Sequence, residues 1–148
     1  MSKELAVLVT VAAGGLVAAQ APANNVISGR VGDFGAALVS FLVGTAVVLL
    51  VTFAVAGGIQ INEGAPTPAW WYWILGGVGG AAIVVVTLIT VRELGAGGTT
   101  AAVIAGQLAL SVVLDRWGVL GLDERAITWE KLLGIALLAA GTVLIVRE

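Results

Sequence analysis

Residues 34–62 carry no charged side chain and read FGAALVSFLVGTAVVLLVTFAVAGGIQIN. A helix needs about 20 predominantly apolar residues to cross the hydrocarbon core of a bilayer, so this stretch is long enough to span a membrane. Three more uncharged runs of comparable length flank it, at residues 5–29, 64–91 and 94–114. The chain therefore has the pattern of several membrane-spanning helices separated by clusters of charge.

A fifth apolar run covers residues 132–146 and is shorter than the others. It becomes long enough to span if Thr128 caps the helix and if Glu130 and Lys131 lie among the lipid headgroups. We therefore predict an all-α membrane protein, a single domain over residues 1–148 with five transmembrane helices. The predicted helices cover residues 4–26, 34–57, 69–91, 97–116 and 128–147.

The first of these segments also has features of a cleavable signal peptide, namely Lys3, an apolar stretch and small residues at Ala19 and Ala21. However, Glu4 weakens the positive leader, and a cut directly before Pro22 is disfavoured. We therefore interpret the segment as the first membrane span.

The composition excludes several classes of protein. Apolar residues make up 59% of the chain and charged residues 11%, with a mean hydropathy of +1.09, whereas a soluble domain carries about 25% charged residues. The net charge of −2 offers no basic surface for nucleic acid. Cysteine and histidine are absent, no carboxylate lies in mid-span, and there is no phosphate-binding loop motif. We expect a protein in contact with lipid that is not an enzyme and has no cofactor or metal site.

The cations are divided almost equally between the two sides of the membrane that five spans would define. Cytoplasmic loops are normally enriched in lysine and arginine, and this bias sets the orientation of a membrane protein. A weak bias favours dual topology, in which copies insert both ways and pair antiparallel; the simpler alternative is that the weak bias still fixes one orientation. The side of the N-terminus would hold Lys3, Arg116, Arg125 and Lys131, and the other side Arg30, Arg92 and Arg147.

Polar side chains in mid-span are candidate functional residues because they are costly in lipid unless they face protein or a cavity. In the fourth predicted helix Thr100, Gln107, Ser111 and Asp115 lie within one arc of the helix surface. Gln107 is near the middle of this helix, where an amide can hold a neutral or zwitterionic solute. The alternative is a hydrogen bond between helices that only stabilises assembly.

The first predicted helix contains Gln20 and Asn24, which are four residues apart and share a face. Pro22 lies between them and removes a backbone donor, so the helix is either kinked beside a cavity or ends there. In the second helix, Ser40 and Gly44 form either a polar notch or a packing surface. We also expect Trp73, the deepest aromatic of its block, to form a cavity wall.

Several of these positions together resemble a known family, the YdcZ-type five-helix proteins of the drug/metabolite transporter superfamily. The resemblance implies a bacterial inner-membrane exporter whose five helices correspond to half of a ten-helix transporter. Asn24 is followed here by a second asparagine, Asn25, which leaves open which amide faces the cavity. The positions that carry the resemblance are Gln20, Pro22, Asn24, Ser40, Phe41, Gly44, Gln107 and Asp115.

We therefore expect a multi-pass protein of the bacterial inner membrane that acts as half of a secondary transporter. An antiparallel homodimer would export or exchange a small neutral or amphipathic metabolite by alternating access. The alternatives are a non-transporting assembly subunit and half of a heterodimer with a homologous partner. The candidate substrate-binding residues are Gln20, Asn24, Ser40, Gly44, Trp73, Gln107 and Ser111.

Overall fold

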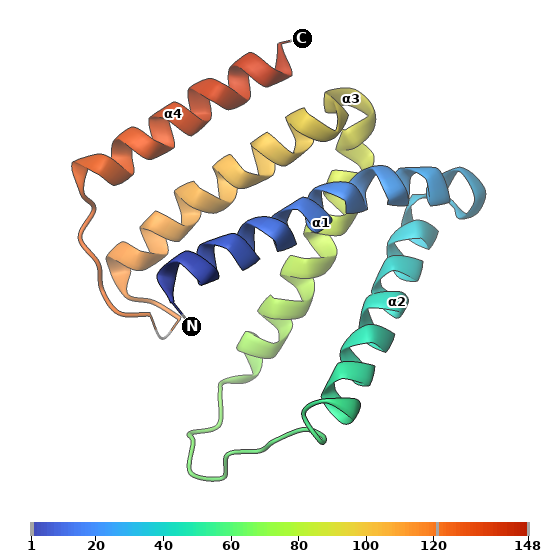
Figure 1. Ribbon diagram of the computed structural model, residues 1–148, viewed down its shortest axis with the longest axis vertical. Coiled ribbons are helices and arrows are strands. Elements are labelled where there is room, and N and C mark those ends of the chain that lie inside the picture. Colours follow the sequence, from blue (N-terminus) through green and yellow to red (C-terminus); the bar gives the residue numbers. More distant parts are fainter. Residues whose placement is uncertain (1, 121, 148) are drawn as a thin grey trace. The chain divides into compact units, whose positions relative to one another are not determined.

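The computed structural model describes residues 2–120 and 122–147, and these residues contain helices and loops but no strand. The predicted all-α class is therefore confirmed. Four helices follow one another along the described residues (Figure 1). They are α1 (Lys3–Val31), α2 (Asp33–Ala54), α3 (Trp70–Trp117) and α4 (Trp129–Val146).

The prediction of five separate helices is not confirmed, because α3 covers both the third and the fourth predicted segments in one element of 48 residues. The loop expected between residues 91 and 97 is reduced to one non-helical residue, Gly95, with φ 67° and ψ 173°. This backbone conformation is essentially restricted to glycine. Charges at Arg92 and Glu93 followed by a glycine predict an interruption, but they do not reveal its length.

The first helix is longer than predicted and runs through Pro22, so the alternative that it ends at this proline is wrong. It stops only at Val31, where Gly32 separates it from α2. Gly32 has φ 76° and ψ 168°, close to the angles of Gly95. Both interruptions are therefore single glycines in the same left-handed, extended conformation.

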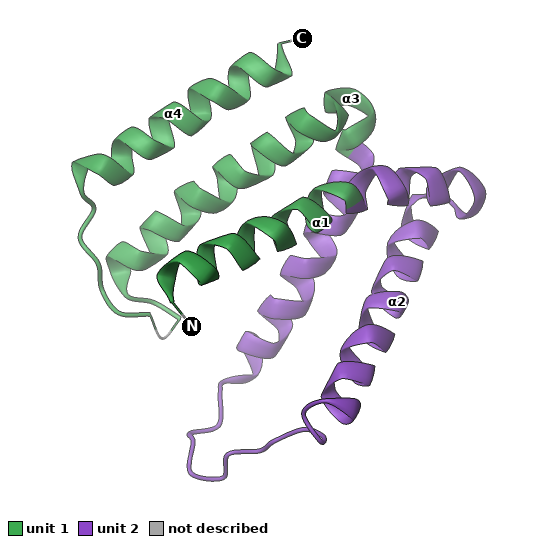
Figure 2. Cartoon of the chain, viewed as in Figure 1, with its two compact units in different colours: residues 1–19, 90–148 green, residues 20–89 purple. Residues whose placement is uncertain are grey.

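The chain forms two compact units, which are coloured separately in Figure 2. One unit comprises residues 20–89, which include the C-terminal part of α1, all of α2 and the first part of α3. Small side chains allow its helices to pack closely: Ala36 is fully buried, and a Cβ built on Gly80 of α3 would lie 3.8 Å from the Phe41 ring of α2.

The other unit comprises residues 1–19 and 90–148, with the rest of α3 packed against α4. A Cβ on Gly98 would lie 3.3 Å from Cγ2 of Val146, so glycine permits a close approach of the two helices. The Thr142 hydroxyl shares its proton between the carbonyl of Leu138 in its own helix, at 2.8 Å, and that of Ala101 across the same contact, at 3.3 Å. Small residues on α3 therefore hold α4 in place.

The start of α4 agrees with the sequence. Thr128 is the N-cap, and its hydroxyl accepts a hydrogen bond from the backbone N–H of Lys131 at 3.4 Å. The ammonium of Lys131 lies 3.8 Å from the Asp115 carboxylate and donates to the carbonyl of Ala126 at 3.3 Å. The predicted cap is thus confirmed, and Lys131 ties the loop before α4 to the end of α3.

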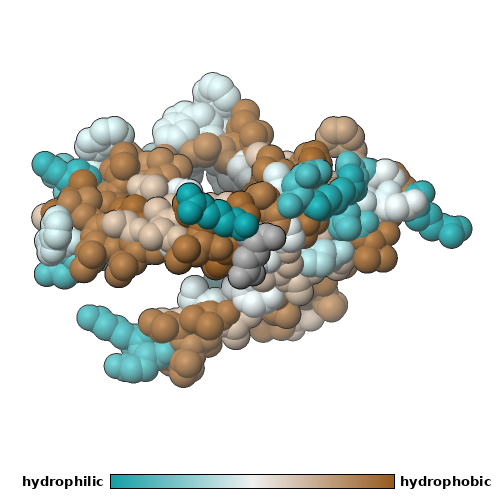
Figure 3. All heavy atoms as spheres, turned by 90° about the horizontal axis from the view of Figure 1, so that it is seen from above, coloured by the Kyte–Doolittle hydropathy of each residue, from teal (hydrophilic) through white to brown (hydrophobic). Residues whose placement is uncertain are grey.

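Most apolar side chains point outwards. None of the described residues of α4 is buried, and in α2 only Ala36 and Ala37 are. Figure 3 shows apolar side chains over most of the visible face, with hydrophilic ones gathered in a few clusters. All four helices are long and apolar enough to cross a membrane. Lipid can cover such a surface, whereas water would oppose its exposure.

Candidate functional site

Three polar side chains form a hydrogen-bonded chain within residues 20–89. Gln20 Nε2 donates to Ser40 Oγ at 3.2 Å, and Ser40 Oγ donates to Asn24 Oδ1 at 3.1 Å. Gln20 and Asn24 lie on α1, Ser40 lies on α2, and Asn24 is only 3% exposed. We call this the Gln20–Ser40–Asn24 relay; it satisfies polar groups whose burial would otherwise be costly.

The sequence explains why these residues meet. Gln20 and Asn24 are one helical turn apart and share a face of α1. Asn24 lies eight residues before Gly32 and Ser40 eight residues after it. A reversal confined to the single residue Gly32 therefore brings equivalent positions of the two helices together. The relay depends on that reversal as much as on the polar residues themselves.

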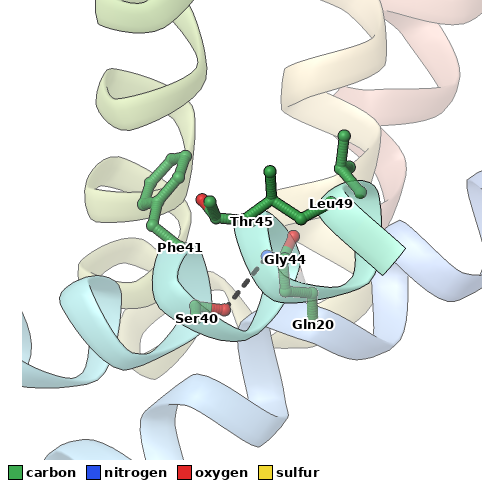
Figure 4. A pocket seen from close by; sticks show the side chains of 7 residues that line it. Gln20, Ser40, Phe41, Gly44, Thr45 and Leu49 are labelled. Atoms are coloured by element: carbon green, nitrogen blue, oxygen red, sulfur yellow. Dashed lines mark hydrogen bonds between the residues drawn. The ribbon is translucent and has the colours of Figure 1, made fainter. Parts of the chain in front are cut away.

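A pocket of about 440 Å³ adjoins the relay (Figure 4). None of its lining residues carries a charge, and a Cβ at Gly44 would meet no atom within 4 Å, so the glycine leaves the pocket open there. The volume is within the range of about 300–1,000 Å³ typical of small-molecule sites. The lining residues are Gln20, Ser40, Phe41, Gly44, Thr45, Val48 and Leu49.

Four of the predicted site residues are thus brought together: Gln20, Ser40 and Gly44 line the pocket, and Asn24 holds Ser40. Asn24, rather than Asn25, is the asparagine in the relay. The sequence analysis missed Thr45, which lies one helical turn after Phe41. The spacing of Phe41, Thr45 and Val48 on one face of a helix was the available signal.

The other three predicted site residues are elsewhere. Trp73, expected as a cavity wall, is 70% exposed and does not line this pocket. Trp71 and Tyr72 are better covered, and their rings stack with centroids 3.8 Å apart. Gln107 and Ser111 belong to the other unit and are exposed on α3. The Gln107 side chain makes no hydrogen bond to another residue that the structure describes.

A comparison with protein families places the chain. The model of a family described as "Putative inner membrane exporter, YdcZ" matches residues 5–144. The chain belongs to this family. The YdcZ family is part of the drug/metabolite transporter clan, and the resemblance predicted from the sequence is confirmed, apart from the five-helix detail. No curated protein and no solved structure matches the chain.

Membership of the YdcZ family indicates where the protein is located and what kind of role it has. The chain is an inner-membrane protein with a role in transport or export, as the family description states, and its apolar helices are long enough to cross a membrane. Transport of this kind is not an enzymatic activity. The predicted localisation is therefore confirmed, and the uncharged pocket beside the partly buried polar relay is a feature of this YdcZ-family protein that suits a solute.

Proposed function

We propose that the chain is half of a secondary transporter, acting as an antiparallel homodimer that moves a small neutral or amphipathic metabolite by alternating access. The observation that carries this proposal is the pocket beside the Gln20–Ser40–Asn24 relay. It combines three polar side chains with the apolar side chains of Phe41, Val48 and Leu49. Such a lining suits a molecule that has a polar end and an apolar body.

The absence of charge among the lining residues supports a neutral substrate. Moving an ion into a site of low polarity costs several kcal/mol unless an opposite charge or several hydrogen bonds compensate. Neither a carboxylate for a cation nor a guanidinium or ammonium for an anion lines the pocket. Neutral molecules avoid this cost.

The length of α3 supports five spans. A straight helix of 48 residues would be about 72 Å long at about 1.5 Å per residue, more than twice the hydrocarbon core of about 30 Å. The interruption at Gly95, next to Arg92 and Glu93, divides it into residues 70–94 and 96–117, each long enough to cross. In our proposal Gly95 lies at the membrane surface, and the two termini lie on opposite sides.

Two features support an inverted partner. The cations divide four to three between the sides, which gives the insertion machinery little reason to prefer one orientation. The amide of Gln107 is exposed on a single chain near the middle of a span, where lipid offers it no hydrogen bond. A second, inverted copy would complete ten spans, with the site near the midplane, as in transporters built from inverted repeats.

Counterflow in proteoliposomes tests transport. A panel of labelled neutral and zwitterionic solutes, from glycerol to tryptophan, should contain at least one that the wild type exchanges faster than empty liposomes. Gln20→Leu should abolish this flux. In the proposed dimer Gln107 also binds the solute, so Gln107→Leu should insert and dimerise normally but abolish the flux as well. If no solute exchanges while Gln107→Leu weakens the dimer in detergent, the protein is an assembly subunit instead.

The orientation has a separate test, because the chain contains no cysteine. A single cysteine is placed at either terminus, and intact cells are treated with an impermeant thiol reagent. Roughly half labelling at both ends is expected for dual topology. All-or-none labelling would contradict the antiparallel homodimer and leave a heterodimer with an oppositely oriented homologue.

A further inference from the structure

We propose that the pocket selects neutral solutes that donate a hydrogen bond, and that the carboxamide oxygen of Gln20 is the group that accepts it. This inference rests on the proposed function in one respect, namely that the pocket holds the solute. It goes further by stating the direction of the hydrogen bond: the ligand donates it and the pocket accepts it.

The hydrogen bonds of the relay couple the orientation of the Gln20 amide to that of the Asn24 amide. The Ser40 hydroxyl has one proton and donates it to Asn24 Oδ1 at 3.1 Å. Its oxygen is then free to accept, and it accepts from Gln20 Nε2 at 3.2 Å. While Asn24 presents its Oδ1 to Ser40, reversing the Gln20 amide alone would set two oxygens against each other without a proton to share. With Asn24 in this orientation, Gln20 keeps its nitrogen towards Ser40.

The other end of the amide is left for a ligand. In Figure 4 the carboxamide oxygen of Gln20 lies on the side away from Ser40. No other described residue donates to this oxygen, and Gln20 is half-buried. A partly covered carbonyl oxygen without a donor is costly, so an incoming N–H or O–H gains the hydrogen bond that water would otherwise provide.

Thr45 adds a third polar group to the pocket, beside Gln20 and Ser40. Threonine in a helix commonly donates to the carbonyl four residues earlier. The Thr45 hydroxyl makes no such bond and no hydrogen bond to another residue that the structure describes, so it can also meet a solute. Thr10, Thr87 and Thr142 are among the threonines that do make this bond, each at 2.8 Å.

The other lining residues indicate the chemical class of the rest of the ligand. Phe41, Val48 and Leu49 present an aromatic ring and branched aliphatic groups. A carboxylate ligand would face the Gln20 oxygen with its own negative oxygens, and an ammonium would donate to that oxygen but would leave its charge unneutralised. The class is therefore a neutral molecule with an N–H or O–H group on an aromatic or aliphatic body.

Three probes that share a fluorinated naphthalene ring system, and differ in one polar group, test whether the pocket prefers this class of ligand. 6-Fluoro-2-naphthol donates a hydrogen bond, 2-acetyl-6-fluoronaphthalene only accepts one, and 6-fluoro-2-naphthylmethylammonium is a cation. The full-length protein in nanodiscs is titrated with each probe and followed by ¹⁹F NMR, with empty nanodiscs to subtract partitioning into lipid. The naphthol should bind about three- to tenfold more tightly than the ketone, as expected for one neutral hydrogen bond, and the cation should bind most weakly.

Two variants distinguish the role of the accepting Gln20 oxygen from that of the Ser40 hydroxyl that orients it, and a third variant is the control. Gln20→Leu should remove the preference for the naphthol. Ser40→Ala should also remove it, because the carboxamide is then free to turn its nitrogen towards the pocket, which makes Ser40 a positioning residue. Gln60→Leu is the matched control, since its amide bonds to the Ala56 carbonyl in a loop, and it should keep the wild-type preference.

Tighter binding of the ketone than of the naphthol by the wild type would overturn the inference, whatever the variants do. An unchanged preference in Ser40→Ala, with the ring still bound, would also overturn the role given to the relay. Binding preference and flux are measured separately, so the two proposals can fail separately. Selective binding without exchange in proteoliposomes contradicts only the transport function, whereas exchange without this preference contradicts only the inference.

Discussion

Replacing Gly95 by alanine tests whether the interruption of α3 depends on glycine. At φ 67° and ψ 173° the backbone is in a region that residues other than glycine adopt only at a cost of about 1–3 kcal/mol. A Cβ at this position would meet no atom within 4 Å, so no steric contact adds to that cost. Gly95→Ala should therefore lower the free energy of unfolding by about 1–3 kcal/mol through backbone strain alone.

Gly106→Ala is the matched control, because Gly106 lies further along the same helix and a Cβ there also has no neighbour within 4 Å. Its backbone is helical, and alanine is favoured over glycine inside a helix by about 1 kcal/mol. The control variant should therefore be as stable as the wild type or more stable. The two substitutions add the same methyl group and should shift stability in opposite directions.

Steric trapping measures both variants in lipid. Biotin is attached to two cysteines introduced together at the exposed positions Lys3 and Asp123, which lie outside the predicted spans, and monovalent streptavidin captures the unfolded chain. Its binding as a function of concentration gives the free energy of unfolding. Equal shifts for Gly95→Ala and Gly106→Ala, or stabilisation by the former, would refute the view that a glycine-only conformation divides α3.

Three smaller predictions use the same assay. Thr128→Ala should cost about 0.5–1 kcal/mol because it removes the cap on the Lys131 N–H, whereas serine should restore it; an equal loss with serine would contradict capping. Gly98→Leu should destabilise by about 1–3 kcal/mol, since even a Cβ lies 3.3 Å from Val146, and no loss would mean that the two helices separate easily. Asp115→Asn should change stability by less than about 1 kcal/mol, because its carboxylate and Lys131 are 31% and 32% exposed; a larger loss, insensitive to salt, would indicate a stronger pair.

The sequence predicted the helices well because charge and hydropathy report directly on the membrane. Uncharged runs located every helix, and Thr128 was correctly identified as the cap of the last one. The number of separate elements was not confirmed, because a charged cluster followed by glycine looks the same for a loop as for the one-residue interruption at Gly95. The helix through Pro22 was uncertain for a similar reason: packing decides whether a proline ends a helix.

The site was harder to predict, because its residues depend on how two helices meet. Gln20, Asn24 and Ser40 were each candidates, but their connection depends on the tight reversal at Gly32. Thr45 was missed because the sequence does not show whether a threonine hydroxyl bonds to its own helix. Trp73 was expected to point inwards, but position in an aromatic block does not determine which ring is covered.

The single-glycine connections at Gly32 and Gly95 also determine where the chain can be cut. Almost all of the described backbone outside helices lies in residues 55–69 and 118–128. In the proposed five-span topology these two segments emerge on the same side of the membrane, and the opposite side shows only tight turns, which fit poorly into a protease active site. A protease added to one side of sealed vesicles therefore distinguishes the orientations without any label. A uniformly inserted protein is cut completely or not at all, and a mixed population is cut in part.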